Sequence, residues 1–424
     1  MYWEQSVQCE AGTDIGLRRK NNEDAYCVHL CHDEAEWVRS GHLMMVADGM
    51  GGHAVGELAS RLAVETVPHT FLKSPPGDPR RVLMEAILAA NRAINDRGTQ
   101  NIDFHHMGTT CSVLALTARG AIIGHVGDSR VYRVRRDRVD QLTFDHSLQW
   151  ELERQHGGME GLIDLSQHKN IITRSLGPEK EVKVDIEGPS VIFPGDVFVL
   201  CSDGLSNQVS DEEIGAIVRE LPPAQAVKLL VDLANLRGGP DNITVVVTRV
   251  GDPPANVSSP AYPLDDFLDE NPGPGWAWLG GIWGAAFGLA SGLALLIVGQ
   301  QLKGAILLIA SLIGMAILLF VSFRVKKVEP LLPPLDDSMT HHSRPHRTAV
   351  GLSSKDLAEL LMRIDTELHH AAKADSWGVD WDEHARIMEN AQTLFREKRY
   401  SKLIRELARA IHLVMEQLPR AVRT

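Results

Sequence analysis

The sequence has 424 residues, 44% of them hydrophobic, which is enough for two or three domains with at least one large core and excludes a disordered chain. Its 55 Asp and Glu residues outnumber its 43 Lys and Arg residues, and the net charge of −12 excludes a general nucleic-acid-binding role. The five cysteines are odd in number and form no CxxC pair, so we expect free thiols in a reducing compartment.

Apolar patterns divide the first 250 residues into short strands and longer helices. The predicted strands cover residues 43–47, 110–116, 121–126, 196–201 and 243–250. The predicted helices cover residues 54–72, 80–96 and 222–236. Because strands and helices segregate along the chain instead of alternating, we expect an α+β fold with antiparallel sheets.

Two uncharged runs, residues 276–302 and 304–323, follow a linker over residues 251–275 that is rich in Pro and Asp. A hydrocarbon core of about 30 Å is crossed by about 20 helical residues. The sequence therefore predicts two transmembrane helices within residues 276–323, which form a tight antiparallel hairpin around Lys303.

Basic residues follow the second uncharged run, at Arg324, Lys326 and Lys327. Because basic residues favour the cytoplasmic side of a membrane, the sequence predicts a two-pass protein of the cell membrane. Both flanks of the hairpin would then lie in the cytoplasm, and the lipid bilayer would be a direct partner.

The rest of the chain is predicted to be a second linker, over residues 324–352, and a small all-α domain, over residues 353–420. Ser353 is a candidate helix cap, and three apolar stripes at helical spacing follow it. Representative members of the three stripes are Leu361, Met388 and Ile411. Their length predicts a three-helix bundle.

Four aspartates in the first 250 residues lie just beyond apolar runs and beside Gly, Asn or Ser: Asp48, Asp128, Asp203 and Asp241. One such aspartate alone is typical of a turn. Four in this context predict a carboxylate cluster, which requires cations because like charges repel. Oxygen ligands favour Mg²⁺ or Mn²⁺, and a pair of such ions activates water for attack on phosphorus.

Seven motifs, four of which contain these aspartates, occur in order along the chain. They are TDIGLRRKNNEDA (13–25), VADGMGGHAVGELAS (46–60), MGTTCSVLAL (107–116), GHVGDSRVYRV (124–134), ITRSLG (172–177), DVFVLCSDGLSNQVS (196–210) and GGPDNITVVV (238–247). Over about residues 5–250 the chain resembles the bacterial metal-dependent Ser/Thr protein phosphatases of the protein phosphatase 2C family. The resemblance implies two antiparallel β-sheets packed as a sandwich and flanked by helices, over a domain of residues 1–250.

The resemblance also implies a binuclear Mn²⁺ or Mg²⁺ site at one end of the sandwich. In it, Asp48 resembles the ligand that bridges both metals, Asp203 and Asp241 resemble further ligands, and Gly49 would contribute its backbone carbonyl. Glu23 and Asp24 look like outer carboxylates that hold metal-bound water. Asp128, together with Asp203, resembles the ligands of a weaker third metal.

Two further residues are implicated in catalysis. Arg19 lies five residues before Asp24, where the family has the arginine that binds the substrate phosphate, and its planar fork suits two phosphate oxygens. Eukaryotic relatives have a general-acid histidine two residues after the bridging aspartate, but this chain has Met50 there. His53 is the nearest candidate proton donor. The alternatives are a structural role for His53 at the start of the next helix, and proton donation by metal-bound water instead.

The predicted function is metal-dependent hydrolysis of phosphoserine and phosphothreonine in proteins at the cytoplasmic face of the membrane. Its partners would be phosphorylated proteins, and it would oppose a Ser/Thr protein kinase. The alternative is a catalytically weak phosphatase-like sensor or scaffold that recruits partners through the C-terminal helices.

Overall fold

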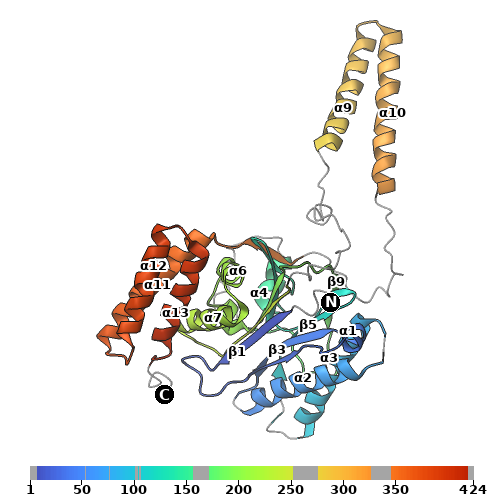
Figure 1. Ribbon diagram of the computed structural model, residues 1–424. Coiled ribbons are helices and arrows are strands. Elements are labelled where there is room, and N and C mark those ends of the chain that lie inside the picture. Colours follow the sequence, from blue (N-terminus) through green and yellow to red (C-terminus); the bar gives the residue numbers. More distant parts are fainter. Residues whose placement is uncertain are drawn as a thin grey trace. The chain divides into compact units, whose positions relative to one another are not determined.

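The computed structural model describes residues 7–52, 54–75, 77–100, 104, 107–155, 171–251, 276–325 and 345–418. The described residues before 258 and after 337 form one compact unit, and those between these positions form a second unit (Figure 1). Each unit is described separately below.

The first unit contains two six-stranded antiparallel sheets. One has the order β1 (Gln8–Asp14), β11 (Ile243–Arg249), β10 (Val197–Cys201), β7 (Arg130–Arg135), β8 (Arg138–Gln141) and β12 (Arg347–Val350). The other has the order β2 (Asp24–His29), β3 (His42–Met50), β5 (Cys111–Thr117), β6 (Gly120–Val126) and β9 (Asp185–Ser190), and the short β4 (Gly108–Thr109) pairs with β3. We call them the β1 sheet and the β2 sheet.

The two sheets pack face to face as a sandwich. Met44 and Val46 of β3 belong to the same buried cluster as Phe198, Leu200 and Val246 of the β1 sheet. The alternate residues of β3 belong to a second cluster on the opposite face of the β2 sheet. Strand β3 reads as a nearly continuous apolar run because both of its faces are covered. The predicted fold class, an α+β sandwich of antiparallel sheets, is confirmed for this unit.

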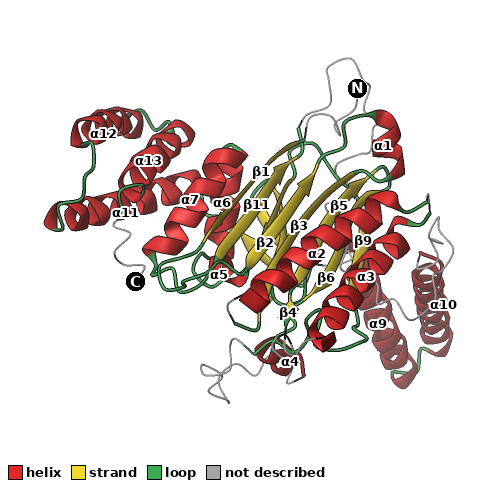
Figure 2. Cartoon of the chain, turned by 90° about the horizontal axis from the view of Figure 1, so that it is seen from below, coloured by secondary structure: helices red, strands yellow, loops and turns green. Residues whose placement is uncertain are grey.

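Helices cover the outer faces of the sandwich (Figure 2). Helices α2 (Ala54–Lys73) and α3 (Pro79–Gln100) pack on the β2 sheet, and α6 (Asp211–Glu220) and α7 (Pro223–Leu236) pack on the β1 sheet. Three short helices lie in the connections: α1 (Glu34–Arg39), α4 (Leu148–Gln155) and α5 (Asp203–Ser206). The strands and helices predicted in the first 250 residues all form, within a few residues of their predicted bounds.

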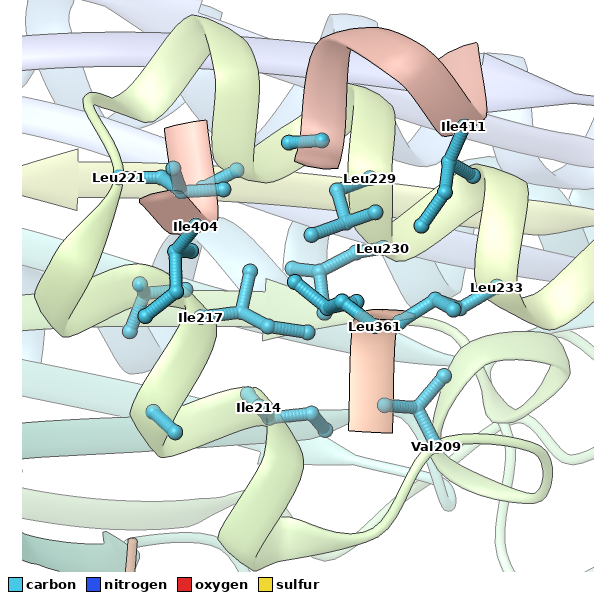
Figure 3. Close-up of a cluster of buried hydrophobic side chains, with 14 of the residues drawn as sticks. Val209, Ile214, Ile217, Leu221, Leu229, Leu230, Leu233, Leu361, Ile404 and Ile411 are labelled. Carbon is cyan, nitrogen blue, oxygen red and sulfur yellow. The ribbon is translucent and has the colours of Figure 1, made fainter. Parts of the chain in front are cut away.

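Three C-terminal helices complete the unit: α11 (Ser354–Ala374), α12 (Trp381–Arg396) and α13 (Tyr400–Met415). Ser353 caps α11 by accepting a hydrogen bond from the Asp356 backbone N–H, as the sequence predicts. The helices do not form a core of their own, because Leu361, Ile404 and Ile411 share one buried cluster with α6 and α7 (Figure 3).

Residues 347–350 differ from the predicted linker over residues 324–352, because they form strand β12 at the edge of the β1 sheet. Arg347 is paired with Gln141 of β8, and the Thr348 hydroxyl donates a 2.9 Å hydrogen bond to Asp140. The local sequence shows no apolar alternation that would predict a strand. These residues are extended because they pair with β8. Residues 326–344 of the predicted linker lie outside the described residues.

The second unit contains α9 (Trp276–Ile297) and α10 (Gln301–Val325), which pack against each other as a helical hairpin. Gly299 turns the chain with a φ of 83°, and Gly292 lies against the backbone of Gly304, where a larger residue would separate the helices. Among the described residues, no helix meets the length and apolarity that crossing a membrane requires. The two predicted transmembrane spans are therefore not supported. The linker predicted over residues 251–275 lies outside the described residues, apart from Gly251.

Candidate active site

The predicted metal-binding aspartates lie at strand ends on one side of the sandwich. Asp24 begins β2 and Asp48 lies near the end of β3, and the two are direct partners across these strands. Asp203 follows β10 and Asp241 precedes β11, which is the antiparallel neighbour of β10. Asp128 follows β6. The topology therefore brings together carboxylates that are up to 217 positions apart in the sequence, from Asp24 to Asp241.

Four of these carboxylates have raised pKa values, because burial and neighbouring charges destabilise their ionised forms. Burial, assisted by neighbouring carboxylates, raises the pKa of Asp24 to about 7, of Asp128 to about 8 and of Asp203 to about 6. Burial raises the pKa of Asp48 well above its ordinary value, and the charges of Asp24, Asp203, Asp128 and Asp241 raise it further. A bound cation would relieve both effects.

Within this cluster, two buried carboxylate oxygens have no hydrogen-bond partner, the Oδ1 atoms of Asp24 and Asp128. The other oxygen of Asp24 accepts a 2.7 Å hydrogen bond from the Ser202 hydroxyl. Unpaired buried oxygens are costly, and in this cluster they fit a site for a hard, oxygen-preferring cation. As they are placed, the described His, Cys, Asp and Glu side chains include no group of three at metal-binding geometry.

The backbone around Asp48 is held rigidly by β4 and β5. The Asp48 N–H donates to the Thr110 hydroxyl at 2.8 Å, and the Asp48 carbonyl accepts from the Thr110 N–H at 2.8 Å and from the Thr109 hydroxyl at 2.9 Å. Gly49 donates to the Glu23 carbonyl at 3.1 Å, and a Cβ atom at Gly49 would clash with the Gly56 carbonyl. Position 49 therefore requires glycine, and the buried backbone of Gly49 packs closely next to Asp48.

Arg19 lies at the rim of the cluster. Its guanidinium donates a 2.6 Å hydrogen bond to Asp241 Oδ2, and its side chain is 51% exposed. The loop that carries it is tied to the loop before β11, because the Leu17 N–H donates to the Gly239 carbonyl at 2.8 Å. The neighbouring Arg18 is exposed. Arg19 thus presents a cation to a ligand that approaches the carboxylates.

The structure brings Arg19, Glu23, Asp24, Asp48, Gly49, Asp128, Asp203 and Asp241 to this end of the sandwich. His53, the candidate proton donor, lies outside the described residues. His146, in the connection between β8 and α4, is buried, and its Nδ1 accepts a 3.0 Å hydrogen bond from the N–H of Gly127, directly before Asp128.

Asn242 is a site residue that the sequence reasoning missed. Its Oδ1 atom accepts from the Glu23 N–H at 2.8 Å, and its Nδ2 atom donates to the carbonyls of Ile15 and Asn21 at 2.9 and 3.0 Å. It therefore joins the Glu23 loop to the Asp241 loop. Its position directly after Asp241 in the GPDN motif was the available signal.

Comparisons with known proteins point to one family. A sequence model described as "Protein phosphatase 2C" matches residues 18–228. A putative protein phosphatase 2C-type of Streptococcus pyogenes is 37% identical over 241 residues, which are 56% of this chain and 95% of that protein. Protein phosphatase PhpP of Streptococcus pneumoniae is 36% identical over 245 residues, which are 57% of this chain and 96% of that protein.

A solved structure supports the same comparison. The structure of the S. agalactiae serine/threonine phosphatase is 35% identical and has a TM-score of 0.52. The match covers 57% of this chain and 99% of that one. The similarity thus extends over essentially the whole length of these proteins, but over little more than half of this chain.

Proposed function

This chain belongs to the protein phosphatase 2C family and is a protein-serine/threonine phosphatase, and on this premise we propose that it hydrolyses phosphoserine and phosphothreonine in proteins with Mn²⁺ or Mg²⁺ as cofactor. The observation that supports the metal dependence is the cluster of five carboxylates, in which the pKa values of Asp24, Asp48, Asp128 and Asp203 are raised and two buried oxygens are unpaired. Its partners are phosphorylated proteins, and it reverses the action of a Ser/Thr protein kinase.

Each group at the site has a proposed role. Asp48, Asp203, Asp241 and the Gly49 carbonyl would hold two cations, with Glu23 and Asp24 as outer carboxylates. Asp128 and Asp203 would hold a weaker third cation. When bound, the cations supply Lewis-acid activation of the attacking water and neutralise charge on the phosphoryl oxygens.

Arg19 orients the substrate in this proposal. Its planar guanidinium suits two oxygens of a phosphoryl group, and Asp241 holds it beside the cluster at 2.6 Å.

The test of the proposed function is the hydrolysis of a phosphothreonine peptide by the full chain. We expect phosphate release with Mn²⁺ or Mg²⁺, its loss in excess EDTA, and its return when Mn²⁺ is added back, because the carboxylates have no chemistry of their own toward a phosphate ester. Full activity in EDTA would exclude the proposed cofactor. No hydrolysis under any of these conditions would exclude the proposed reaction.

Replacing Arg19 by Ala should raise the KM for a phosphothreonine peptide about tenfold. A charge-assisted hydrogen bond contributes about 1.5 to 3 kcal/mol, and the lower end applies here because the side chain is half exposed and screened by solvent. Steady-state kinetics measures the effect. The matched control is Arg18→Ala, which removes a neighbouring exposed arginine and should leave KM unchanged. If both variants behave alike, Arg19 is a surface charge.

The location at the cytoplasmic face of a membrane stays a prediction from the two uncharged runs and the basic residues after them. The described helices lend it no support.

A further inference from the structure

Residues 346–350, which come after the helical hairpin in the chain, lie at the catalytic end of the sandwich. Strand β12 extends the β1 sheet, and the His346 N–H donates a 2.9 Å hydrogen bond to the Gln141 carbonyl at the end of β8. Gln141 in turn donates through Nε2 to Asp145 at 2.8 Å, four residues along the chain. His346 and Arg347 therefore lie beside the loop that follows β8.

These two residues line a cavity that also contains part of the carboxylate cluster. The cavity has a volume of about 670 Å³, and Asp128 and Asp203 form part of its wall. Arg347 lies outside residues 18–228, the part of the chain that the family model matches. A residue from the C-terminal segment thus contributes to the surface next to the proposed metal ligands.

Two arginines are among the described residues that line this cavity, and they differ in their availability. Arg130 is 12% exposed, and it donates to Asp145 from Nε and Nη2 and to the Tyr132 hydroxyl from Nη1. All three nitrogen atoms of the Arg130 guanidinium therefore already donate hydrogen bonds to other side chains of the protein. Arg347 is 61% exposed, and its Nε atom lies 3.7 Å from Asp211 Oδ2, beyond the normal length of a hydrogen bond.

The Asp211 carboxylate has partners other than Arg347. Its Oδ1 atom accepts a 2.9 Å hydrogen bond from the Tyr132 hydroxyl and lies 3.9 Å from Arg130. The exposed guanidinium of Arg347 is therefore able to bind a further anion without leaving a buried carboxylate unpaired.

We propose that Arg347 is a substrate-specificity residue, which binds an acidic side chain that flanks the phosphorylated residue of the substrate. The inference rests on the proposed function and deepens it. Arg19, which would bind the phosphoryl group, is not among the described residues that line this cavity, so the two arginines serve different parts of the substrate. A peptide that extends from the carboxylate cluster along the cavity meets Arg347.

The test uses the full chain and three phosphothreonine peptides that differ only in the flanking residues, which are Glu, Gln or Lys. Wild type should have the highest kcat/KM on the Glu peptide. Arg347→Gln should lower the ratio of kcat/KM between the Glu and Gln peptides about three- to tenfold, the range expected for a charged contact in a partly exposed position. Arg347→Glu should shift the preference to the Lys peptide.

Two controls separate recognition from structure. Arg363→Gln removes an exposed arginine of the same C-terminal segment that does not line the cavity, and it should leave the peptide ratio at the wild-type value. Arg347→Lys keeps the charge and should retain most of the preference. Thermal unfolding of each variant, followed by circular dichroism, should give the wild-type midpoint, because the Arg347 side chain is largely exposed.

The outcomes are distinguishable. If wild type hydrolyses the peptides but the ratio is the same in Arg347→Gln, the specificity role is wrong and the proposed function stands. A preference of wild type for the Lys peptide would also overturn the role, because it would assign recognition to the acidic side chains of the cavity. If wild type hydrolyses none of the peptides, the proposed function itself fails.

Discussion

Asp48→Asn should lower the turnover of a phosphothreonine peptide by roughly two to three orders of magnitude or more, which is the scale expected when charge stabilisation at a reacting phosphoryl group is lost. Asp48 lies at the centre of the cluster, where four other aspartates act on its charge. Removal of this carboxylate should therefore weaken the binding of divalent cations as well as the chemistry. Single-turnover kinetics and Mn²⁺ titration by calorimetry measure the two effects.

Although Asp48→Asn should lower turnover, it should stabilise the metal-free protein against unfolding. Because burial and neighbouring carboxylates raise the pKa of Asp48, its ionised form destabilises the folded state at neutral pH. In EDTA, Asp48→Asn should unfold at a higher temperature than wild type. The control is Asp137→Asn, at an exposed aspartate in the turn between β7 and β8, which should change neither activity nor stability. Retained turnover in Asp48→Asn would refute the role of the cluster.

Leu361→Ala in α11 should destabilise the phosphatase unit by about 2 to 5 kcal/mol, the usual cost of a cavity in a well-packed core. Leu361 is fully buried in the cluster that includes Ile217, Leu230 and Leu233 of α6 and α7 (Figure 3). Since the C-terminal helices and the phosphatase fold share this core, we expect heat or urea to unfold them in one transition, and activity to be lost together with the helical signal.

The matched control for Leu361→Ala is Val350→Ala. Val350 ends β12 and is 65% exposed, so the loss of its methyl groups should change the free energy of unfolding by less than about 0.5 kcal/mol. Wild type could instead show two separate unfolding transitions, with Leu361→Ala shifting only the transition of the C-terminal helices. That result would show that these helices fold independently. Deletion of residues 345–424 should have a larger effect than either substitution, because it uncovers the apolar face of α6 and α7.

For the C-terminal region, the sequence predicts the helices but not their packing partner. The spacing of Leu361, Ile404 and Ile411 predicts amphipathic helices, and these form. An amphipathic stripe shows that one face of a helix is buried but contains no information on what buries it. The partner surface on α6 and α7 is more than a hundred residues away in the sequence, so the shared core became visible only in the tertiary structure.

The sequence did not predict strand β12 or the position of Arg347 beside the cavity. Four residues without apolar alternation form a strand because the edge of β8 offers unpaired backbone groups, and this is a property of the sheet and not of residues 347–350. The sequence by itself predicted antiparallel sheets and the cluster of aspartates, because each of these aspartates lies at the end of a local apolar run. The sandwich and the role of Arg19 were implied by the resemblance to the family. Only the tertiary structure decided which segments share a core and which side chains line the cavity, because contacts between distant segments depend on how the sheets and helices pack.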